Sequence, residues 1–444
     1  MSIIKRLSGI VEGHPHQGPA EDDMQRWPSM TMLIVGGIIS VPLFTFGGEV
    51  GKLADYSTIL EALLISSIFL GVFGVTTGYI GIVTRLPTAM ILQRTFGIRG
   101  SLAITIMLTL VSIGWFGIQL QIIVQSVAAI LHKQLNISVN EHVGIILTGL
   151  LISSTAIIGI KAMGKVAVIG VPLLLIATLI PLGMGMSNGG LDTLFGARDI
   201  PHAYSLGMLV SLIVGTEVFP VSINPDLSRF LKTNRDNRIS MLLGFGLAFP
   251  LLLALAAALG IIYNNADLVT TMLVAGIALP GLAVIILATW TNNDQNLYSS
   301  ALSLSAIFPR MERWHLACLA ALAGTGLAAV DVLGHFILLL NFMGLALAPM
   351  AGVYVADFFL DRPRYTATAP QLPSYRPYPV ASWIFGTVLG FTTLPSEESG
   401  LGLFHLTGAP SLDALVSAML LLFIAKKFFS ANASNRQIIG DEKC

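Results

Sequence analysis

Long apolar stretches, separated by short polar segments, run through most of the sequence. Because a helix needs about 20 apolar residues to cross the hydrocarbon core of a bilayer, each stretch predicts one membrane-spanning helix. The stretches lie near residues 29–50, 58–83, 101–131, 141–162, 165–187, 203–230, 239–264, 277–303, 314–331, 333–358, 379–396 and 410–429. The pattern therefore predicts an all-α membrane protein with about twelve transmembrane helices.

Composition supports the same class of protein. Hydrophobic residues make up 54% of the 444 residues and charged residues 11%, whereas soluble domains carry roughly 25% charged residues. The formal net charge is zero and there is no basic stripe, so no nucleic-acid partner is expected. Cys318 and Cys444 are far apart in the sequence, which argues against a disulfide or a cysteine metal site.

The positions of Lys and Arg predict the orientation in the membrane. With the N-terminus inside, Lys52, Lys133 and Arg198 are the only ones of the 24 that fall on the outer side. We therefore expect a multi-pass inner (plasma) membrane protein with both termini cytoplasmic. The expected segments are a cytoplasmic N-terminal tail (1–28, polar and without a cleavable signal), a first five-helix unit (29–187), a second (203–358), two further helices (379–429) and a C-terminal tail (430–444).

Two predicted spans contain helix-breaking residues at matching places in the two units. The first span contains Pro42 and Gly47-Gly48, and the sixth contains Gly215 and Pro220. Proline removes a backbone donor and glycine loosens a helix, so both helices are expected to be discontinuous. Interrupted helices five spans apart are typical of an inverted repeat whose half-helix ends face substrate and ion. The alternative is that Pro and Gly are simply common in membrane helices.

Glu217 lies at the expected break of the sixth span. An ionised carboxylate inside the membrane costs several kcal/mol unless it is paired, so Glu217 predicts a ligand or ion site. The alternative is a structural glutamate bonded to a neighbouring helix. A carboxylate accepts two hydrogen bonds from a ligand edge that presents two donors. This favours amino-bearing rings, such as guanine, adenine or an aminopyrimidine, over uracil and hydantoins.

Two other predicted spans present polar groups. In the third, Ser112, Trp115 and Gln119 have the spacing i, i+3 and i+7 and share one helix face. An indole beside an amide suits a planar ligand, although Trp115 could equally pack in the core. The eighth span ends in an unbroken polar run from Thr291 to Asn296. These side chains must line water, an ion or a ligand, or pack into polar protein.

Several of these residues lie in stretches that resemble the NCS1 nucleobase:cation symporter family, of the purine-cytosine permease type. The resemblance covers nearly the whole chain, and its most specific elements are Gly114-Trp115-Phe116-Gly117 and Trp290-Thr291-Asn292-Asn293-Asp294. It implies a LeuT-like five-plus-five inverted repeat with two additional C-terminal helices, helices 1 and 6 discontinuous. It also implies alternating access, with a nucleobase held between the first, third, sixth and eighth helices.

Position by position, the resemblance implies that Trp115 stacks on the base and that Gln119 and Asn293 hydrogen-bond to it. Three more residues occupy substrate-contact positions of the family but are of a different type, so the contacts are rearranged there: Ser112, Glu217 and Phe219.

A sodium site is implied in the same way. Its expected oxygen ligands are contributed by Gly36, Ile39, Ala288, Thr291 and Asn292. Asn292 replaces a hydroxyl residue of the family pattern, and an amide oxygen is also a ligand for a hard cation. The alternative coupling ion is a proton, with Glu217 or Asp294 as the titrating group. No other cofactor is expected.

The predicted function is secondary active import of a nucleobase, purine or cytosine-like, by cation symport, with the lipid bilayer as surroundings and a monomer as the working unit. The alternatives are a proton-coupled transporter of another flat N-heterocycle (hydroxymethylpyrimidine, allantoin or hydantoin) and a channel. Channels usually build their filter from repeated subunits. An enzyme would need a nucleophile–base pair or a metal cluster, which the sequence does not show.

Overall fold

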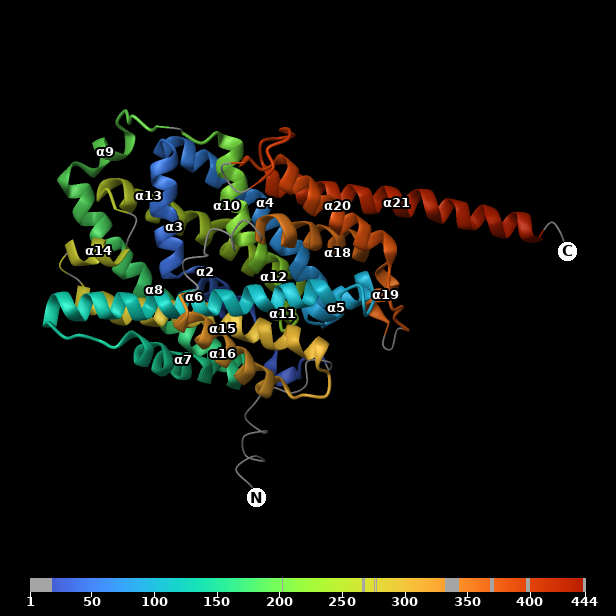
Figure 1. Ribbon diagram of the computed structural model, residues 1–444, viewed down its shortest axis with the longest axis horizontal. Coiled ribbons are helices and arrows are strands. Elements are labelled where there is room, and N and C mark those ends of the chain that lie inside the picture. Colours follow the sequence, from blue (N-terminus) through green and yellow to red (C-terminus); the bar gives the residue numbers. More distant parts are fainter. Residues whose placement is uncertain are drawn as a thin grey trace, which may run out of the picture.

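The computed structural model describes residues 18–201, 203–265, 268–274, 276, 278–331, 343–367, 371–396 and 400–441. In these residues the chain is a bundle of helices with one isolated β-bridge, between Gln25 and Leu231 (Figure 1). The longer helical segments are α2 (Trp27–Ile38), α3 (Val41–Leu53), α4 (Tyr56–Thr84), α6 (Leu102–Leu135), α7 (Glu141–Ile158), α8 (Ile160–Gly185), α10 (Leu206–Ser222), α12 (Asn234–Met241) continued by η3 (Leu242–Ala248) and α13 (Phe249–Ile262), α15 (Ala278–Ile307), α16 (Arg313–Ala329), η5 (Met343–Leu347) continued by α18 (Ala348–Leu360), α20 (Pro377–Thr393) and α21 (Pro410–Asp441).

Shorter helices join these segments. They are η1 (Glu21–Asp23), α5 (Thr88–Phe96), η2 (Met186–Gly190), α9 (Leu191–Phe195), α11 (Pro225–Ser228), α14 (Leu268–Val274) and α19 (Arg362–Thr366). The prediction of an all-α protein is confirmed, and most predicted spans begin and end within a few residues of a long helix. Residue 277 of the eighth predicted span and residues 333–342 of the tenth lie outside the described part of the chain. The last helix, α21, reaches Asp441 instead of ending near residue 429, and Figure 1 shows it projecting from the bundle.

The outer surface of the bundle is apolar. Leu64, Leu147 and Leu150 are largely exposed on α4 and α7, and a surface of this kind is solvated by lipid rather than water. Among the described residues, seven helices are long and apolar enough to cross a membrane, or up to eight if the bent pair α2 and α3 forms one span. About twelve spans were expected. Some of the expected spans correspond to helices that are not in this count. Among these, α16 and α20 are short, with 17 residues each, and α15 contains the polar run.

The first predicted span is broken. α2 ends at Ile38, α3 begins at Val41, and the two helices meet at a bend of 60°. Ile39 and Ser40 between them have extended backbone angles. Pro42, in the first turn of α3, has no N–H with which to continue the hydrogen bonds of α2. The discontinuity therefore leaves the last carbonyl groups of α2 without helical partners.

Gly47 and Gly48, which were also expected at this break, lie inside α3 instead. A Cβ added to Gly47 would lie 2.3 Å from the Cβ of Ala256 in α13, and one added to Gly260 would lie 2.5 Å from the Cα of Gly48. The absence of side chains at these positions lets α3 and α13 approach closely. Their role is packing, and the sequence prediction is wrong on this point.

The predicted break inside the sixth span is also corrected by the structure. α10 is continuous through Gly215, Glu217 and Pro220, and ends at Ser222. A proline within a helix removes one hydrogen bond, here to the carbonyl of Thr216, without ending the helix. The chain leaves the helix at Ile223 and resumes it in α11, which starts at Pro225. The carboxylate of Glu217 therefore projects from an intact helix that lacks one internal hydrogen bond.

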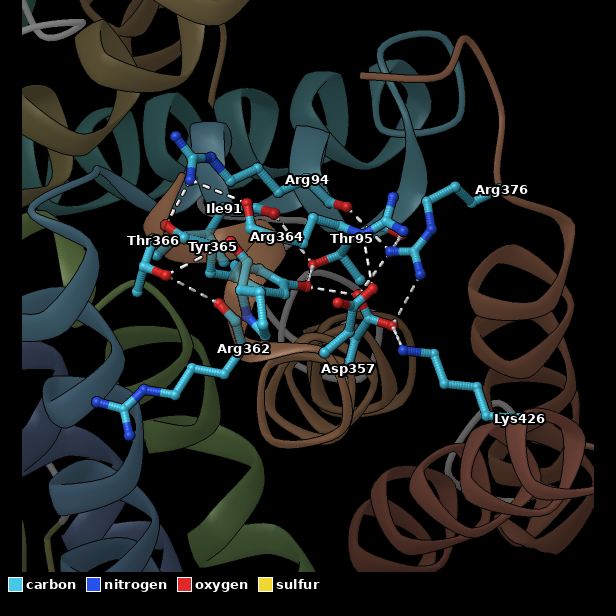
Figure 2. Close-up of polar contacts among 12 residues, drawn as sticks. Ile91, Arg94, Thr95, Asp357, Arg362, Arg364, Tyr365, Thr366, Arg376 and Lys426 are labelled. Atoms are coloured by element: carbon cyan, nitrogen blue, oxygen red, sulfur yellow. Dashed lines mark hydrogen bonds and ion pairs between the residues drawn. The ribbon is translucent and has the colours of Figure 1, made fainter. Parts of the chain in front are cut away.

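A buried ion cluster ties five segments of the chain together (Figure 2). Its centre is Asp357 of α18, whose side chain is fully buried. The carboxylate accepts hydrogen bonds from Arg376 at 2.6 and 3.1 Å and pairs with Lys426 of α21 at 2.6 Å. The hydroxyl of Tyr365, in α19, donates to Asp357 at 2.6 Å and lies 2.7 Å from the hydroxyl of Thr95, in α5. Burial and the neighbouring carboxylate raise the pKa of Tyr365, which keeps it a donor.

Replacing Asp357 by asparagine should therefore destabilise the protein strongly. Breaking a buried ion pair costs about 3–5 kcal/mol, because the remaining charges stay buried without compensation. We expect a clear fall in the thermal unfolding temperature in detergent. Asp361→Asn is the matched control, since its pair with Arg364 is about one-third exposed and should contribute about 0–1 kcal/mol. Equal unfolding temperatures for the two variants would contradict a central role for Asp357.

Candidate functional site

A cavity of about 910 Å³, counting its open mouth, lies among α2, α3, α6, α10 and α15. Its walls are largely apolar, with contributions from Ile34, Ile38, Leu43, Phe46, Phe219 and Phe245. Ser40, in the break between α2 and α3, also lines it. The two features expected to converge, a broken first helix and the sixth predicted span, thus meet at one cavity.

From α6, Trp115 and Gln119 reach the cavity. The indole Nε1 of Trp115 donates to the sulfur of Met343 in η5 at 2.9 Å, which fixes the edge of the ring. Ser112, expected on the same face, is buried outside the cavity lining, and its hydroxyl donates to the carbonyl of Leu108 at 2.9 Å. Its short side chain is used within its own helix.

From α10, Thr216, Glu217 and Phe219 face the cavity together with Pro220. The side chain of Glu217 is 7% exposed, and its Oε2 has no hydrogen-bond partner in the described part of the chain. Among the residues that line the cavity, Glu217 is the single one with an acidic or basic side chain. The site therefore presents one carboxyl oxygen that is available to a ligand.

From α15, four polar residues at i, i+3, i+4 and i+7 form a stripe along the cavity: Asn292, Gln295, Asn296 and Ser299. Asn293, which was expected to bind the base, is fully buried and is not part of the lining. A step of one residue turns a side chain by about 100° around the helix axis, which directs Asn293 away from the face used by Asn292. The sequence contains the stripe as helical spacing that begins in the polar run and continues to Ser299.

The stripe is held by amide hydrogen bonds. The Oδ1 atom of Asn292 accepts from the Nε2 of Gln119 and, at 2.9 Å, from the Nδ2 of Asn296. The Nδ2 of Asn292 donates to the carbonyl of Gly37, and the Nε2 of Gln295 donates to the carbonyl of Leu33. Asn292 thus links α15 to α6 and to the end of α2.

Asp294, the second carboxylate expected to titrate, lies on another face of α15. It is fully buried, is not part of the cavity lining, and accepts from the hydroxyl of Thr155 in α7 at 2.6 Å. The indole of Trp290 donates to the same hydroxyl at 2.7 Å. These contacts join α15 to α7 and do not connect Asp294 to the cavity.

The five residues expected to hold sodium fit a cation only in part. Gly36 and Thr291 are adjacent, since a Cβ added to Gly36 would lie 3.2 Å from the Cβ of Thr291. Ile39 follows the end of α2, Ala288 lies in α15, and both contribute only main-chain oxygens to the expected set. Asn292 does not fit, because its oxygen already accepts two donors and its amino group faces the Gly37 carbonyl.

Residues 19–401 match a family described as permease for cytosine/purines, uracil, thiamine, allantoin. Among relatives, the cytosine permease of Escherichia coli (strain K12) is 29% identical over 353 residues, which is 79% of this chain and 82% of the relative. The hydantoin permease of Microbacterium maritypicum is 26% identical over 291 residues, covering 61% of this chain and 59% of the relative.

Solved structures share the fold. Mhp1, a nucleobase-cation-symport-1 family transporter in a closed conformation with bromovinylhydantoin bound, aligns with a TM-score of 0.79 at 20% identity, over 94% of this chain and 96% of that one. A Na⁺-coupled sialic acid symporter aligns with a TM-score of 0.67 at 14% identity, over 91% and 90% of the two chains. The helices of this chain are thus arranged as in membrane transporters.

Proposed function

Since the chain belongs to the nucleobase-cation-symport-1 family, the permeases for cytosine/purines, uracil, thiamine and allantoin, we propose that it imports an amino-bearing nucleobase together with a cation. The protein is a multi-pass membrane permease and not an enzyme. Its substrates are small molecules of the nucleobase or hydantoin type. The narrower assignment, to purines or cytosine-like rings, rests on the cavity.

The proposed architecture is twelve spans, with both termini cytoplasmic. The first five spans (29–187) and the next five (203–358) form an inverted repeat, and the last two (379–429) are additional. The bend between α2 and α3 and the interruption after α10 support this arrangement, since interrupted first and sixth helices are typical of such repeats. Alternating access then exposes the cavity to one side of the membrane at a time, and a monomer suffices.

The observation that carries the substrate class is the Oε2 of Glu217, which has no hydrogen-bond partner among the described residues and is buried in a cavity whose lining, in that part of the chain, has no basic side chain. A buried acceptor requires a donor, and the exocyclic amine of adenine, guanine or cytosine supplies one. Uracil and hydantoins have no exocyclic amine, and their ring N–H donors stand beside carbonyls, so their edges do not present two adjacent donors to the two carboxylate oxygens. A site built to receive a donor rejects a ligand lacking it far more strongly than one lacking a methyl group.

The rest of the cavity suits a flat ring. The indole of Trp115, held at its edge by Met343, is the proposed stacking surface. The Oε1 of Gln119 is buried without a partner in the described part of the chain, while Ser299 and Asn296 line the same space. We propose that these groups hydrogen-bond to the ring edges that Glu217 does not reach. Phe219 adds an apolar wall.

A competition experiment tests the substrate class. In cells expressing the protein, unlabelled adenine, guanine or cytosine at 100-fold excess should abolish uptake of whichever labelled amino-bearing base is carried. Uracil, allantoin and 5-substituted hydantoins at the same concentration should leave it largely intact, because their ring edges put a carbonyl where Glu217 needs a donor. Inhibition by uracil, with none by the three amino-bearing bases, would overturn the assignment.

A hydantoin-type substrate is the second candidate. The hydantoin permease relative and the hydantoin-bound structure of the same fold support it, as does Gln119, whose amide can hydrogen-bond to an imide edge. The same competition panel separates the two candidates, since a hydantoin transporter would be inhibited by hydantoins and not by adenine or cytosine.

A further inference from the structure

We infer that the coupling ion is a proton, shared between Glu217 and the substrate, and that the amide of Asn292 occupies the place of a sodium ligand. The substrate edge involved is an amidine: an exocyclic amine beside a ring nitrogen that carries no hydrogen, as in cytosine and adenine. This inference rests on the proposed function and concerns the ion that drives it.

The first observation is the orientation of Asn292. A side-chain amide has one oxygen, and here that oxygen accepts from both Gln119 and Asn296. The amino group points at the carbonyl of Gly37, next to the end of α2. With Gln119 and Asn296 as they stand, rotating the Asn292 amide alone to present its oxygen to a cation would turn its amino group toward these two donors. A hydrogen-bond donor therefore faces the carbonyl end of the broken helix, where sodium would need an oxygen.

The second observation is the isolation of Glu217 from positive charge. α10 packs against α4, η5, α18 and α21. The described titratable side chains of these elements are exposed or bonded and packed elsewhere: Tyr56, Glu61, Tyr79, Tyr354, Asp357, Asp413, Lys426 and Lys427. Across the cavity, Asp294 is bonded to Thr155, and Glu49 pairs with Lys52 at the exposed end of α3. Within the described residues, no cation balances Glu217, so a proton or a ligand donor must do so.

The chemistry of an amidine edge fits one proton between these groups. The carboxylic acid O–H donates to the ring nitrogen, while the amine donates to the other carboxyl oxygen. Moving the proton to the ring nitrogen gives a carboxylate that accepts two donors, so both descriptions contain the same atoms and the same charge. The only covalent bond made or broken is the one to this proton, which enters from outside with the base and leaves inside with it. Each transport cycle then moves one base and one positive charge.

The test uses the full-length protein in liposomes and a labelled base that the competition panel shows to be carried. An inside-alkaline pH gradient without sodium should accumulate the base at least tenfold over an ionophore-treated control. An inward sodium gradient at equal pH should change uptake less than twofold. Accumulation driven by sodium and absent with the pH gradient would overturn the inference while leaving the proposed function in place. Failure to take up any amino-bearing base under either gradient would instead count against the proposed function.

Two variants test the roles of Asn292 and Glu217 separately. Asn292→Thr restores a hydroxyl beside Thr291 and should confer sodium stimulation, whereas Asn296→Thr, one turn along the same face, should not.

Glu217→Gln should lose accumulation driven by the pH gradient but still exchange internal for external base at equal pH and saturating concentration, because that exchange needs no net proton movement. Retained proton-driven accumulation in Glu217→Gln would show that another group carries the proton.

Discussion

Replacing Glu217 by glutamine should weaken the apparent affinity for amino-bearing bases by roughly 10- to 150-fold, since a hydrogen bond to a charged group contributes about 1.5–3 kcal/mol. The amide keeps one oxygen acceptor and adds two donors, which face the amine of the base. Initial rates of uptake over a range of base concentrations, at matched expression, measure the change. Glu49→Gln is the matched control, because Glu49 is exposed and paired with Lys52 outside the cavity.

The same variant separates a ligand site from a structural role. If Glu217 were a structural residue bonded to a neighbouring helix, its replacement would lower the unfolding temperature of the empty protein. Because its Oε2 lacks a partner among the described residues, we expect the unfolding temperature of Glu217→Gln to be equal to or above that of the wild type. Unchanged affinity together with reduced stability would assign Glu217 to the fold and not to the substrate.

The helices were the part of this protein that the sequence predicted best. Apolar stretches long enough to cross a membrane have few alternatives to helix, because lipid offers no partner for a free backbone group. The break near Pro42 was also predictable, since proline lacks the required N–H. Pro220 was misleading because one missing hydrogen bond does not end a helix, and Pro225, with the same chemistry, marks the resumption of the helix in α11 instead.

The cavity was predicted in outline, and the errors arose from rotation about helix axes. Trp115, Gln119, Glu217 and Phe219 line it. Asn293 was chosen by resemblance, whereas helical spacing along α15 gives the stripe that runs from Asn292 to Ser299. Residue spacing was thus the better guide on α15, because a one-residue shift moves a side chain to another face.

The environment of Asp357 could not be predicted from local sequence. It lies near the end of a predicted span, and its partners come from residues far along the chain, Thr95 through Tyr365 on one side and Lys426 on the other. Only the packing of α5, α18, α19 and α21 brings these groups together. Short helices such as α5 were likewise missed, because nine residues carry too little periodic signal to separate them from a loop.

Replacing Trp115 by alanine should abolish high-affinity uptake. Stacking of a base on an aromatic side chain contributes about 1–3 kcal/mol, so its loss corresponds to roughly 5- to 150-fold in affinity. Trp115→Phe keeps an aromatic face and should retain part of the affinity, although it loses the N–H that donates to Met343. Met343→Leu removes the sulfur acceptor at similar volume and isolates the effect of anchoring the ring, which we expect to be smaller than that of losing it. Concentration-dependent uptake at equal surface expression is the measurement for all three. If the alanine variant takes up the base with wild-type affinity, Trp115 only packs between α6 and η5, and the base must stack elsewhere in the cavity.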